Sequence, residues 1–76
     1  MAKLPVISGS DLIKALGRIG YVEVRAKGSH RRLRCPTDPT RRPTTVPMHR
    51  EIRRGTLLSI LADANLTVEQ LIELLA

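Results

Sequence analysis

The stretch Ala26-Lys27-Gly28-Ser29-His30-Arg31-Arg32 decides the predicted fold, because it places a tight turn between two extended segments. Gly28 can reach the positive φ angle that a two-residue hairpin turn requires. Apolar and polar residues alternate through residues 21–27 before the turn and through residues 30–35 after it. Alternation with a period of two is typical of strands, so the stretch predicts a β-hairpin.

The alternation also predicts which face of the hairpin is buried. Three apolar residues of the first strand share the face that we expect to pack on the core: Val22, Val24 and Ala26. In the second strand Leu33 and Cys35 are expected to face inward, with Arg31 at the open end. The opposite face should be exposed and mostly basic, and it carries Tyr21, Glu23, Arg25, Lys27, His30, Arg32 and Arg34.

A helix is predicted before the hairpin, over residues 9–19. Ser8 can act as its N-cap, and Asp11 stands three residues later, as in a capping box with a shorter acid. Apolar residues recur at helical spacing through the segment. Gly20 then suits the left-handed conformation that commonly ends a helix.

Two further helices are predicted near the end of the chain. Apolar residues at helical spacing follow Arg54, and Asn65 suits a left-handed cap at the end of that helix. Thr67-Val68-Glu69-Gln70 has the pattern of a capping box and should open a short final helix.

Between the hairpin and these helices, residues 36–43 contain three prolines and predict a loop, and residues 44–47 predict a short third strand. The element order is therefore α-β-β-β-α with a short C-terminal helix. We expect an α+β fold, in which a three-stranded antiparallel sheet carries its helices on one face. At 76 residues the chain should form a single domain, residues 1–76.

Positive charge is concentrated in the middle of the chain. Ten of the 13 Lys and Arg residues lie between Arg25 and Arg54, where Asp38 and Glu51 are the only acids. That segment therefore carries a formal charge of +8, against +6 for the whole chain. Positive charge clustered in one segment indicates a polyanionic partner, rather than a surface whose charges only contact water.

Other classes of protein are disfavoured by composition. The single cysteine, Cys35, excludes an internal disulfide and a cysteine-based zinc site. No segment approaches the roughly 18 apolar residues of a membrane span, and the first residues lack the apolar core of a signal peptide. These features predict a cytoplasmic protein that does not enter a membrane.

His30 is the first candidate for catalysis. Histidine can accept or give a proton near neutral pH, as RNA cleavage through the 2′-hydroxyl requires. Gly28 and Ser29 would shape the site, and the Ser29 hydroxyl could contact a phosphate. The expected phosphate contacts are Lys27, Arg31, Arg32, Arg34 and Arg50. An ordinary surface histidine at the start of a strand remains the alternative.

His49 is the second candidate, in the segment Pro47-Met48-His49. Two imidazoles can supply one base and one acid, provided that the third strand brings His49 near His30. The alternative is a turn residue without a chemical role.

Several other activities are poorly supported. A serine hydrolase would need a Gly-x-Ser-x-Gly turn, which is absent. No paired acids stand near either histidine, so no metal or other cofactor is expected. A DNA-binding regulator would need a helix with clustered basic residues for the major groove. A single tyrosine and no Phe or Trp offer little for stacking on bases, which favours a protein that reads RNA backbone and shape.

With these motifs the sequence resembles the HicA family of mRNA interferase toxins, from Ser8 to Leu75. The motifs that carry the resemblance are Ser8-Gly9-Ser10-Asp11-Leu12, Gly20-Tyr21, Lys27-Gly28-Ser29-His30, Val46-Pro47-Met48-His49, Arg54-Gly55-Thr56-Leu57-Leu58-Ser59-Ile60-Leu61 and Leu66-Thr67-Val68-Glu69-Gln70-Leu71. Each is weak alone, but their order in so short a chain is specific. The proline-rich loop, residues 36–43, departs from the tight hairpin expected there.

The resemblance implies a fold like that of double-stranded-RNA-binding domains. It implies a toxin of a type II toxin–antitoxin pair, acting in the prokaryotic cytoplasm as a metal-independent endoribonuclease on mRNA. The catalytic histidine of the family's Gly-Ser-His motif falls on His30. The resemblance further implies a HicB-type antitoxin that covers the site in a hetero-oligomer. The alternative function is a non-catalytic RNA-binding module of the same fold, for which the imidazole of His30 would be dispensable.

Overall fold

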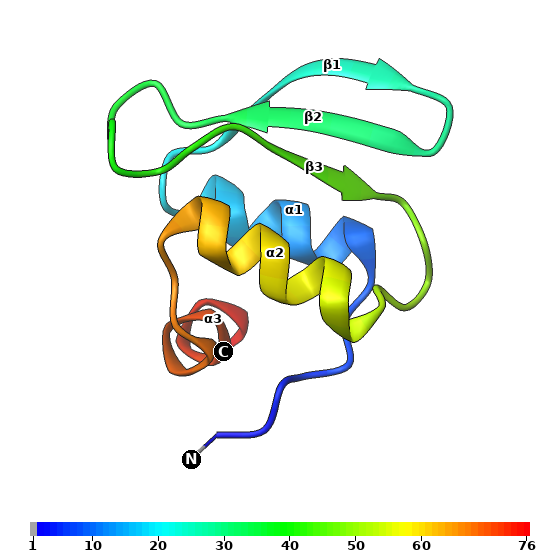
Figure 1. Ribbon diagram of the computed structural model, residues 1–76, viewed down its shortest axis with the longest axis vertical. Coiled ribbons are helices and arrows are strands. Elements are labelled where there is room, and N and C mark those ends of the chain that lie inside the picture. The colour runs from blue at the N-terminus through cyan, green and yellow to red at the C-terminus, as the bar shows by residue number, and fades with distance from the viewer. Residues whose placement is uncertain (1) are drawn as a thin grey trace.

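The computed structural model describes residues 2–76, in which three helices and one antiparallel sheet form. The elements are α1 (Gly9–Gly17), β1 (Val22–Lys27), β2 (His30–Arg34), β3 (Thr44–Pro47), α2 (Arg54–Ala64) and α3 (Val68–Leu75). The strand order is β1-β2-β3, and the three helices lie on one side of the sheet (Figure 1). This confirms the predicted α+β fold and its likeness to double-stranded-RNA-binding domains.

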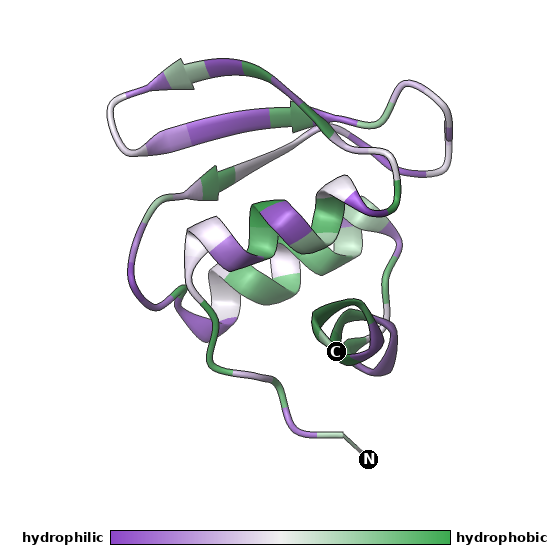
Figure 2. Cartoon of the chain, turned by 180° about the vertical axis from the view of Figure 1, so that it is seen from behind, coloured by the Kyte–Doolittle hydropathy of each residue, from purple (hydrophilic) through white to green (hydrophobic). Residues whose placement is uncertain are grey.

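The core lies between the sheet and the helices. Helices α1 and α2 lie next to the sheet, and α3 packs on the side of them that faces away from the sheet (Figure 1). Side chains that are almost fully buried come from all three helices and from β2 and β3: Leu12, Leu16, Leu33, Val46, Leu57 and Leu71. The hydrophobic colours accordingly gather where the helices face one another, while the hairpin is largely hydrophilic (Figure 2).

The predicted helix ends are largely confirmed. The Ser8 hydroxyl accepts a hydrogen bond from the Asp11 amide at 3.1 Å, and Thr67 and Gln70 make both bonds of the capping box. Asn65 ends α2 in the left-handed region, with φ of 55°. Helix α1 ends two residues earlier than predicted, and a turn leads to Gly20, which has φ of 106°.

The predicted burial of the first strand is wrong. Every residue of β1 is exposed, including Val22 and Val24, each about half exposed. One cause is a β-bulge at Val24: Glu23 pairs with Leu33 but Arg25 pairs with Arg32. Residues that lie opposite each other share a face, so Glu23 lies on the side of buried Leu33, where Val22 was expected. The other cause is that the helices pack beneath β3 and leave β1 uncovered.

Tyr21 also lies differently from the prediction, which placed it on the exposed face. Its ring is buried, and its hydroxyl donates a hydrogen bond to the Arg42 carbonyl oxygen at 2.7 Å. Burial raises the pKa of the Tyr21 hydroxyl above its usual value. The residue therefore belongs to the core and offers no surface for stacking on bases. The inward positions of Leu33 and Cys35 are confirmed, since both are buried.

The proline-rich segment 36–43 is a loop, as predicted, and it is fastened to the end of α2. The Arg42 amide donates to the Asp63 carbonyl oxygen at 2.7 Å, and the Arg41 guanidinium donates to the Ala64 carbonyl oxygen. Within the loop, hydrogen bonds from the side chain and amide of Thr40 lower the pKa of Asp38. Because the loop is held in this way, β2 and β3 still pair in a regular antiparallel register.

Candidate active site

The turn before His30 has the geometry that the sequence predicts. Lys27 pairs with His30 across a two-residue loop, Gly28-Ser29. Gly28 has φ of 58° whereas Ser29 lies at negative φ, which is the pattern of a type II′ turn. The hairpin therefore ends with Lys27 and His30 side by side on one face of the sheet.

That face is the one turned away from the helices. Leu33 is buried against the core, and side chains alternate along a strand, so His30, Arg32 and Arg34 all point outward. Arg25 is paired with Arg32 and therefore joins them. The predicted basic outer face of the second strand is confirmed.

The third strand brings the segment of His49 to the hairpin turn. His30 lies opposite Pro47 in the β2–β3 register. The Met48 amide then donates a hydrogen bond of 2.6 Å to the Ser29 carbonyl oxygen. The dipeptides Ser29-His30 and Met48-His49 are thus joined by their own backbones.

Helix α1 holds the same segment from the other side. The Gly9 amide at the start of α1 donates to the His49 carbonyl oxygen at 2.9 Å. A Cβ atom at Gly9 would overlap the Pro47 carbonyl oxygen and press on the Met48 Cα atom. Gly9 therefore allows the helix to approach the backbone that carries His49.

His30 and His49 line one hollow on the surface of the molecule. Its volume is about 370 Å³, and its walls come from β2, β3, the segment after β3 and the start of α2. The lining residues are His30, Thr45, Pro47, His49, Arg53 and Thr56. We call this space the two-histidine hollow. It answers the question that the sequence left open, because the fold does bring the two imidazoles to one site.

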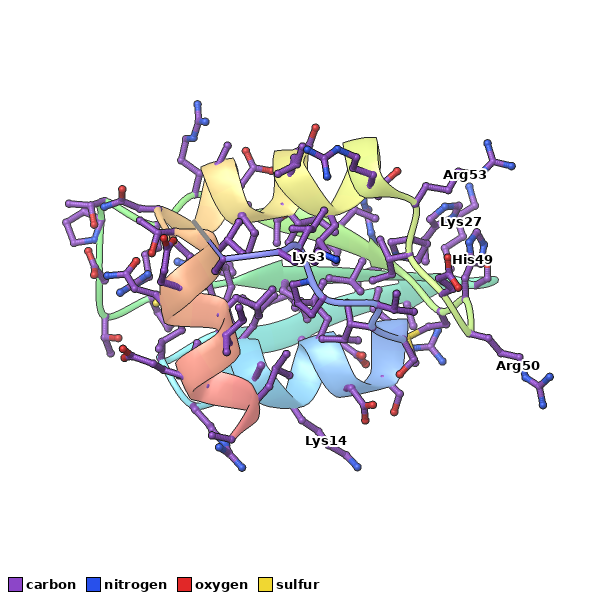
Figure 3. The ribbon with its side chains drawn as sticks, turned by 90° about the horizontal axis from the view of Figure 1, so that it is seen from below. Lys3, Lys14, Lys27, His49, Arg50 and Arg53 are labelled. Atoms are coloured by element: carbon purple, nitrogen blue, oxygen red, sulfur yellow. The ribbon has the colours of Figure 1, made fainter. Side chains whose placement is uncertain are left out.

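A smaller hollow of about 170 Å³ continues along the outer face of the sheet. It shares His30 and Thr45 with the two-histidine hollow and is otherwise lined by Arg25, Lys27 and Arg32. We call Arg25, Lys27 and Arg32 the basic track. His30 thus lies between the basic track and the imidazole of His49. Figure 3 shows Lys27, His49 and Arg53 at the same end of the molecule.

The cations around His30 are free to meet an anion. The ion pairs within residues 2–76 are Arg31–Glu23, Arg41–Asp38 and Arg42–Asp63, none of which uses a residue of either hollow. Arg32 donates to the Thr45 hydroxyl at 3.0 Å, which fixes its guanidinium beside the hollow. The site therefore presents positive charge that no carboxylate neutralises.

The remaining sequence-predicted residues lie outside the hollows. Arg31 faces the other side of the sheet, where it pairs with Glu23 and donates to the Gly28 carbonyl oxygen. Arg34 lies farther along the outer face of β2. Arg50 is exposed and points away from His49 and Arg53 (Figure 3). The Ser29 side chain is exposed, and its backbone carbonyl holds Met48.

Five lining residues were not among the sequence-predicted site residues: Arg25, Thr45, Pro47, Arg53 and Thr56. Arg25 could have been found from the alternation of the first strand, which places it on the basic face. The others reach the hollow only because β3 pairs with β2 and α2 begins beside β3. No local sequence pattern carries that information.

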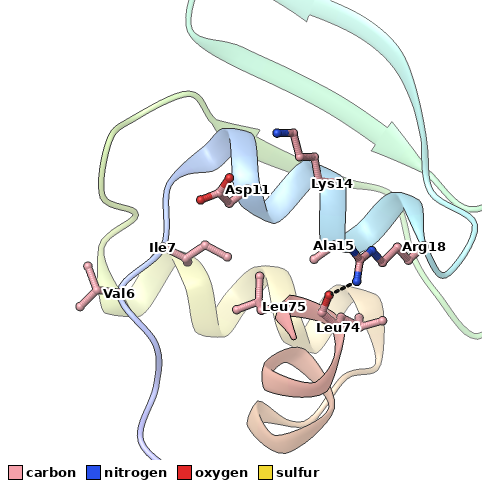
Figure 4. A pocket seen from close by; sticks show the side chains of 8 residues that line it. All are labelled: Val6, Ile7, Asp11, Lys14, Ala15, Arg18, Leu74 and Leu75. Atoms are coloured by element: carbon pink, nitrogen blue, oxygen red, sulfur yellow. Dashed lines mark hydrogen bonds between the residues drawn. The ribbon is translucent and has the colours of Figure 1, made fainter.

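A separate hollow lies between α1, α3 and the residues before α1 (Figure 4). It is lined mainly by aliphatic side chains together with Asp11, Lys14 and Arg18. Arg18 donates to the Leu74 carbonyl oxygen at 2.7 Å and so connects the two helices. This hollow contains no imidazole, and we assign it no catalytic role.

Neither a metal cluster nor a membrane span is found in the described part of the chain. No three His, Cys, Asp or Glu side chains among residues 2–76 are grouped so as to hold a metal ion. None of the helices there has both the length and the apolar character to cross a membrane.

Comparison with known proteins gives one family. Residues 9–66, about three quarters of the chain, match the family model described as "HicA toxin of bacterial toxin-antitoxin". The match includes every residue that lines the two-histidine hollow and the smaller hollow beside it, and it ends before α3. The comparison with curated proteins found no similar sequence.

Proposed function

Because this chain belongs to the HicA family of bacterial toxins, we propose that it is a metal-independent endoribonuclease that cleaves mRNA, with His30 as its catalytic residue. As a family member it is the toxin of a toxin–antitoxin system. The observation that supports the activity is the position of His30, which lines both the basic track and the two-histidine hollow.

The proposed binding mode places an RNA phosphate beside His30. Arg25, Lys27 and Arg32 line the track on one side, and Arg53 lines the hollow on the other. These cations would hold the phosphate and offset the charge that develops on it during cleavage. Arg34 and Arg50 would contact RNA phosphates farther from the reacting one. Arg31 would contact a phosphate from the other face of the sheet, where it pairs with Glu23.

The proposed chemistry uses proton transfer by the protein and no metal ion. Apart from Pro47, the lining side chains are imidazoles, hydroxyls and cations, without the carboxylates that hard divalent ions prefer. Gly28 and Ser29 would shape the site through the type II′ turn. His30 would serve as general acid or base, a function that contributes about 10²–10⁴-fold to a rate.

We further propose that the antitoxin partner is a HicB-type protein that covers this basic face and forms a hetero-oligomer with the toxin. An acidic partner surface would suit the unpaired cations and would speed association at low salt.

The deciding experiment compares the wild type with His30→Ala on a labelled mRNA in EDTA. We expect cleavage by the wild type and a loss of about 10²–10⁴-fold in the variant, with RNA binding retained. Lys14→Ala removes an exposed cation of α1 that lines neither the two-histidine hollow nor the smaller hollow beside it. It serves as the matched control, with full cleavage expected.

Other outcomes would change the proposal. RNA binding without cleavage by the wild type would favour the non-catalytic RNA-binding module. Cleavage that survives His30→Ala would show that another residue carries the reaction. Activity abolished by EDTA and restored by a divalent ion would contradict the metal-independent chemistry.

A further inference from the structure

We propose that His49 is a second catalytic residue, and that His30 and His49 divide the two proton transfers of RNA cleavage between them. The inference rests on the proposed ribonuclease function and goes beyond it, because the Gly-Ser-His motif points to His30 alone. It is carried by the two-histidine hollow, in which both imidazoles are lining groups.

The backbone fixes the two histidines relative to each other. His30 is paired with Pro47, the last residue of β3, and His49 follows two residues later on the same segment. The bond from the Met48 amide to the Ser29 carbonyl oxygen extends the ladder by one step toward His49. Because both side chains line the same hollow, both can reach a phosphate placed within it.

Helix α1 adds a second restraint that serves this segment. The Gly9 amide binds the His49 carbonyl oxygen, and the missing side chain of Gly9 is what makes that approach possible. The structural contact of His49 is therefore made by its backbone. Its imidazole is exposed and makes no hydrogen bond to any residue within 2–76, and the same is true of His30. Both imidazoles are available for proton transfer.

The surroundings suit a phosphate that lies between the imidazoles. Arg53, the residue before α2, and Thr56, in its first turn, line the hollow together with His49, and Thr45 lines it from β3. Arg25 and Lys27 of β1 and Arg32 of β2 line the smaller hollow with His30, and Arg50 and Glu51 follow His49 on its own segment. Glu51 lines neither hollow, and the Lys and Arg residues that do are cationic, as binding of a phosphodiester requires.

The reaction needs two proton transfers and no other reagent. One imidazole accepts the proton of the 2′-hydroxyl as the 2′-oxygen forms a bond to phosphorus. The other gives a proton to the 5′-oxygen as the bond from phosphorus to that oxygen breaks. The products are a 2′,3′-cyclic phosphate and a 5′-hydroxyl, so atoms, protons and electrons balance. A single imidazole would have to perform both transfers in turn.

The test uses a leaving group that needs no acid. After the cleavage site in an mRNA has been mapped, a short oligoribonucleotide is made with sulfur in place of the bridging 5′-oxygen at that site. A thiol has a pKa near 8.5, so a thiolate can leave without receiving a proton. Removing the general acid should therefore slow cleavage of the ordinary RNA but hardly affect the sulfur substrate.

We expect His49→Ala to lower the rate on ordinary RNA by about 10²–10⁴-fold, with RNA binding and melting temperature unchanged. One of the two variants, His49→Ala or His30→Ala, should regain nearly the wild-type rate on the sulfur substrate, and the other should not. The variant that is rescued identifies the acid, and the variant that is not rescued identifies the base. Lys14→Ala again serves as the control.

The pH dependence of the cleavage rate provides a second test, because losing a purely structural residue would not change the shape of that profile. With one acid and one base, the wild-type rate should rise and then fall with pH, and each single variant should lose one of the two limbs.

Three results would overturn the proposal. Undiminished cleavage of ordinary RNA by His49→Ala would exclude a catalytic role for His49 and leave His30 standing. Equal losses on both substrates in both variants would show that neither imidazole is the acid. No cleavage of either substrate by the wild type would instead remove the ribonuclease function itself, and this inference with it.

Discussion

Strands β1 and β3 are the two edges of one small sheet, yet they are built for different surroundings. In β3, Thr44, Val46 and Pro47 are buried, because α1 and α2 pack against this side of the sheet. In β1 no residue is buried, and Val24 is 51% exposed while Val46 is 0% exposed. The same residue type is thus core in one edge strand and surface in the other. Burial follows from where the helices lie.

The two edge strands make different contributions to the candidate site. The covered edge carries the segment Pro47-Met48-His49 into place, whereas the uncovered edge contributes the basic track through Arg25 and Lys27. An exposed edge strand invites pairing with other chains, and both the bulge at Val24 and the charged neighbours of that residue discourage it. The uncovered edge can therefore remain open for the proposed contact with RNA.

The largest expected effect comes from the contact between α1 and the covered edge. Gly9→Ala should lower the free energy of unfolding by about 3 kcal/mol, because its Cβ atom would overlap the Pro47 carbonyl oxygen. Gly17→Ala, at the open end of the same helix, meets no atom within 4 Å and should stabilise the protein by about 0.5–1 kcal/mol. Urea denaturation of both variants measures the difference. Equal stabilities would mean that α1 does not press on the segment before His49.

A matched pair of valines tests the two edges directly. Val46→Ala should cost about 2 kcal/mol, since it removes fully buried methyl groups and leaves a cavity. Val24→Ala should change stability by less than about 0.5 kcal/mol, because that side chain is largely in water. Both values come from urea titrations under the same conditions. A large loss for Val24→Ala would indicate that β1 is covered in solution.

The smallest effect concerns Tyr21, which marks the point where the covered region ends and β1 begins. Tyr21→Phe should cost about 1 kcal/mol, because the Arg42 carbonyl oxygen loses its hydrogen-bond donor. The pKa of Tyr21 is raised by burial, so its contribution is complete below pH 10 and is lost as pH rises through the folded-state pKa. Stability above pH 10 should therefore fall more steeply in the wild type than in Tyr21→Phe. Parallel pH profiles of the two proteins would contradict the buried position of this hydroxyl.

Local features were predictable from the sequence because they depend on a few neighbouring residues. The Gly28-Ser29 turn, the Ser8 and Thr67 caps and the left-handed Asn65 each satisfy backbone groups within one turn of chain. The outward direction of His30 followed from the same local alternation. The first strand was mispredicted because a bulge shifts its alternation and because its cover depends on distant helices.

The sequence by itself determined the elements, their order, the basic hairpin and the histidine at its turn, since propensity, capping and alternation act over a few residues. Only the tertiary structure decided that β1 is bare and that Tyr21 is buried. It also decided that His49, Arg53 and Thr56 meet His30 in one hollow. These results depend on strand register and on the close approach that Gly9 permits, and such long-range contacts form only when the whole chain packs.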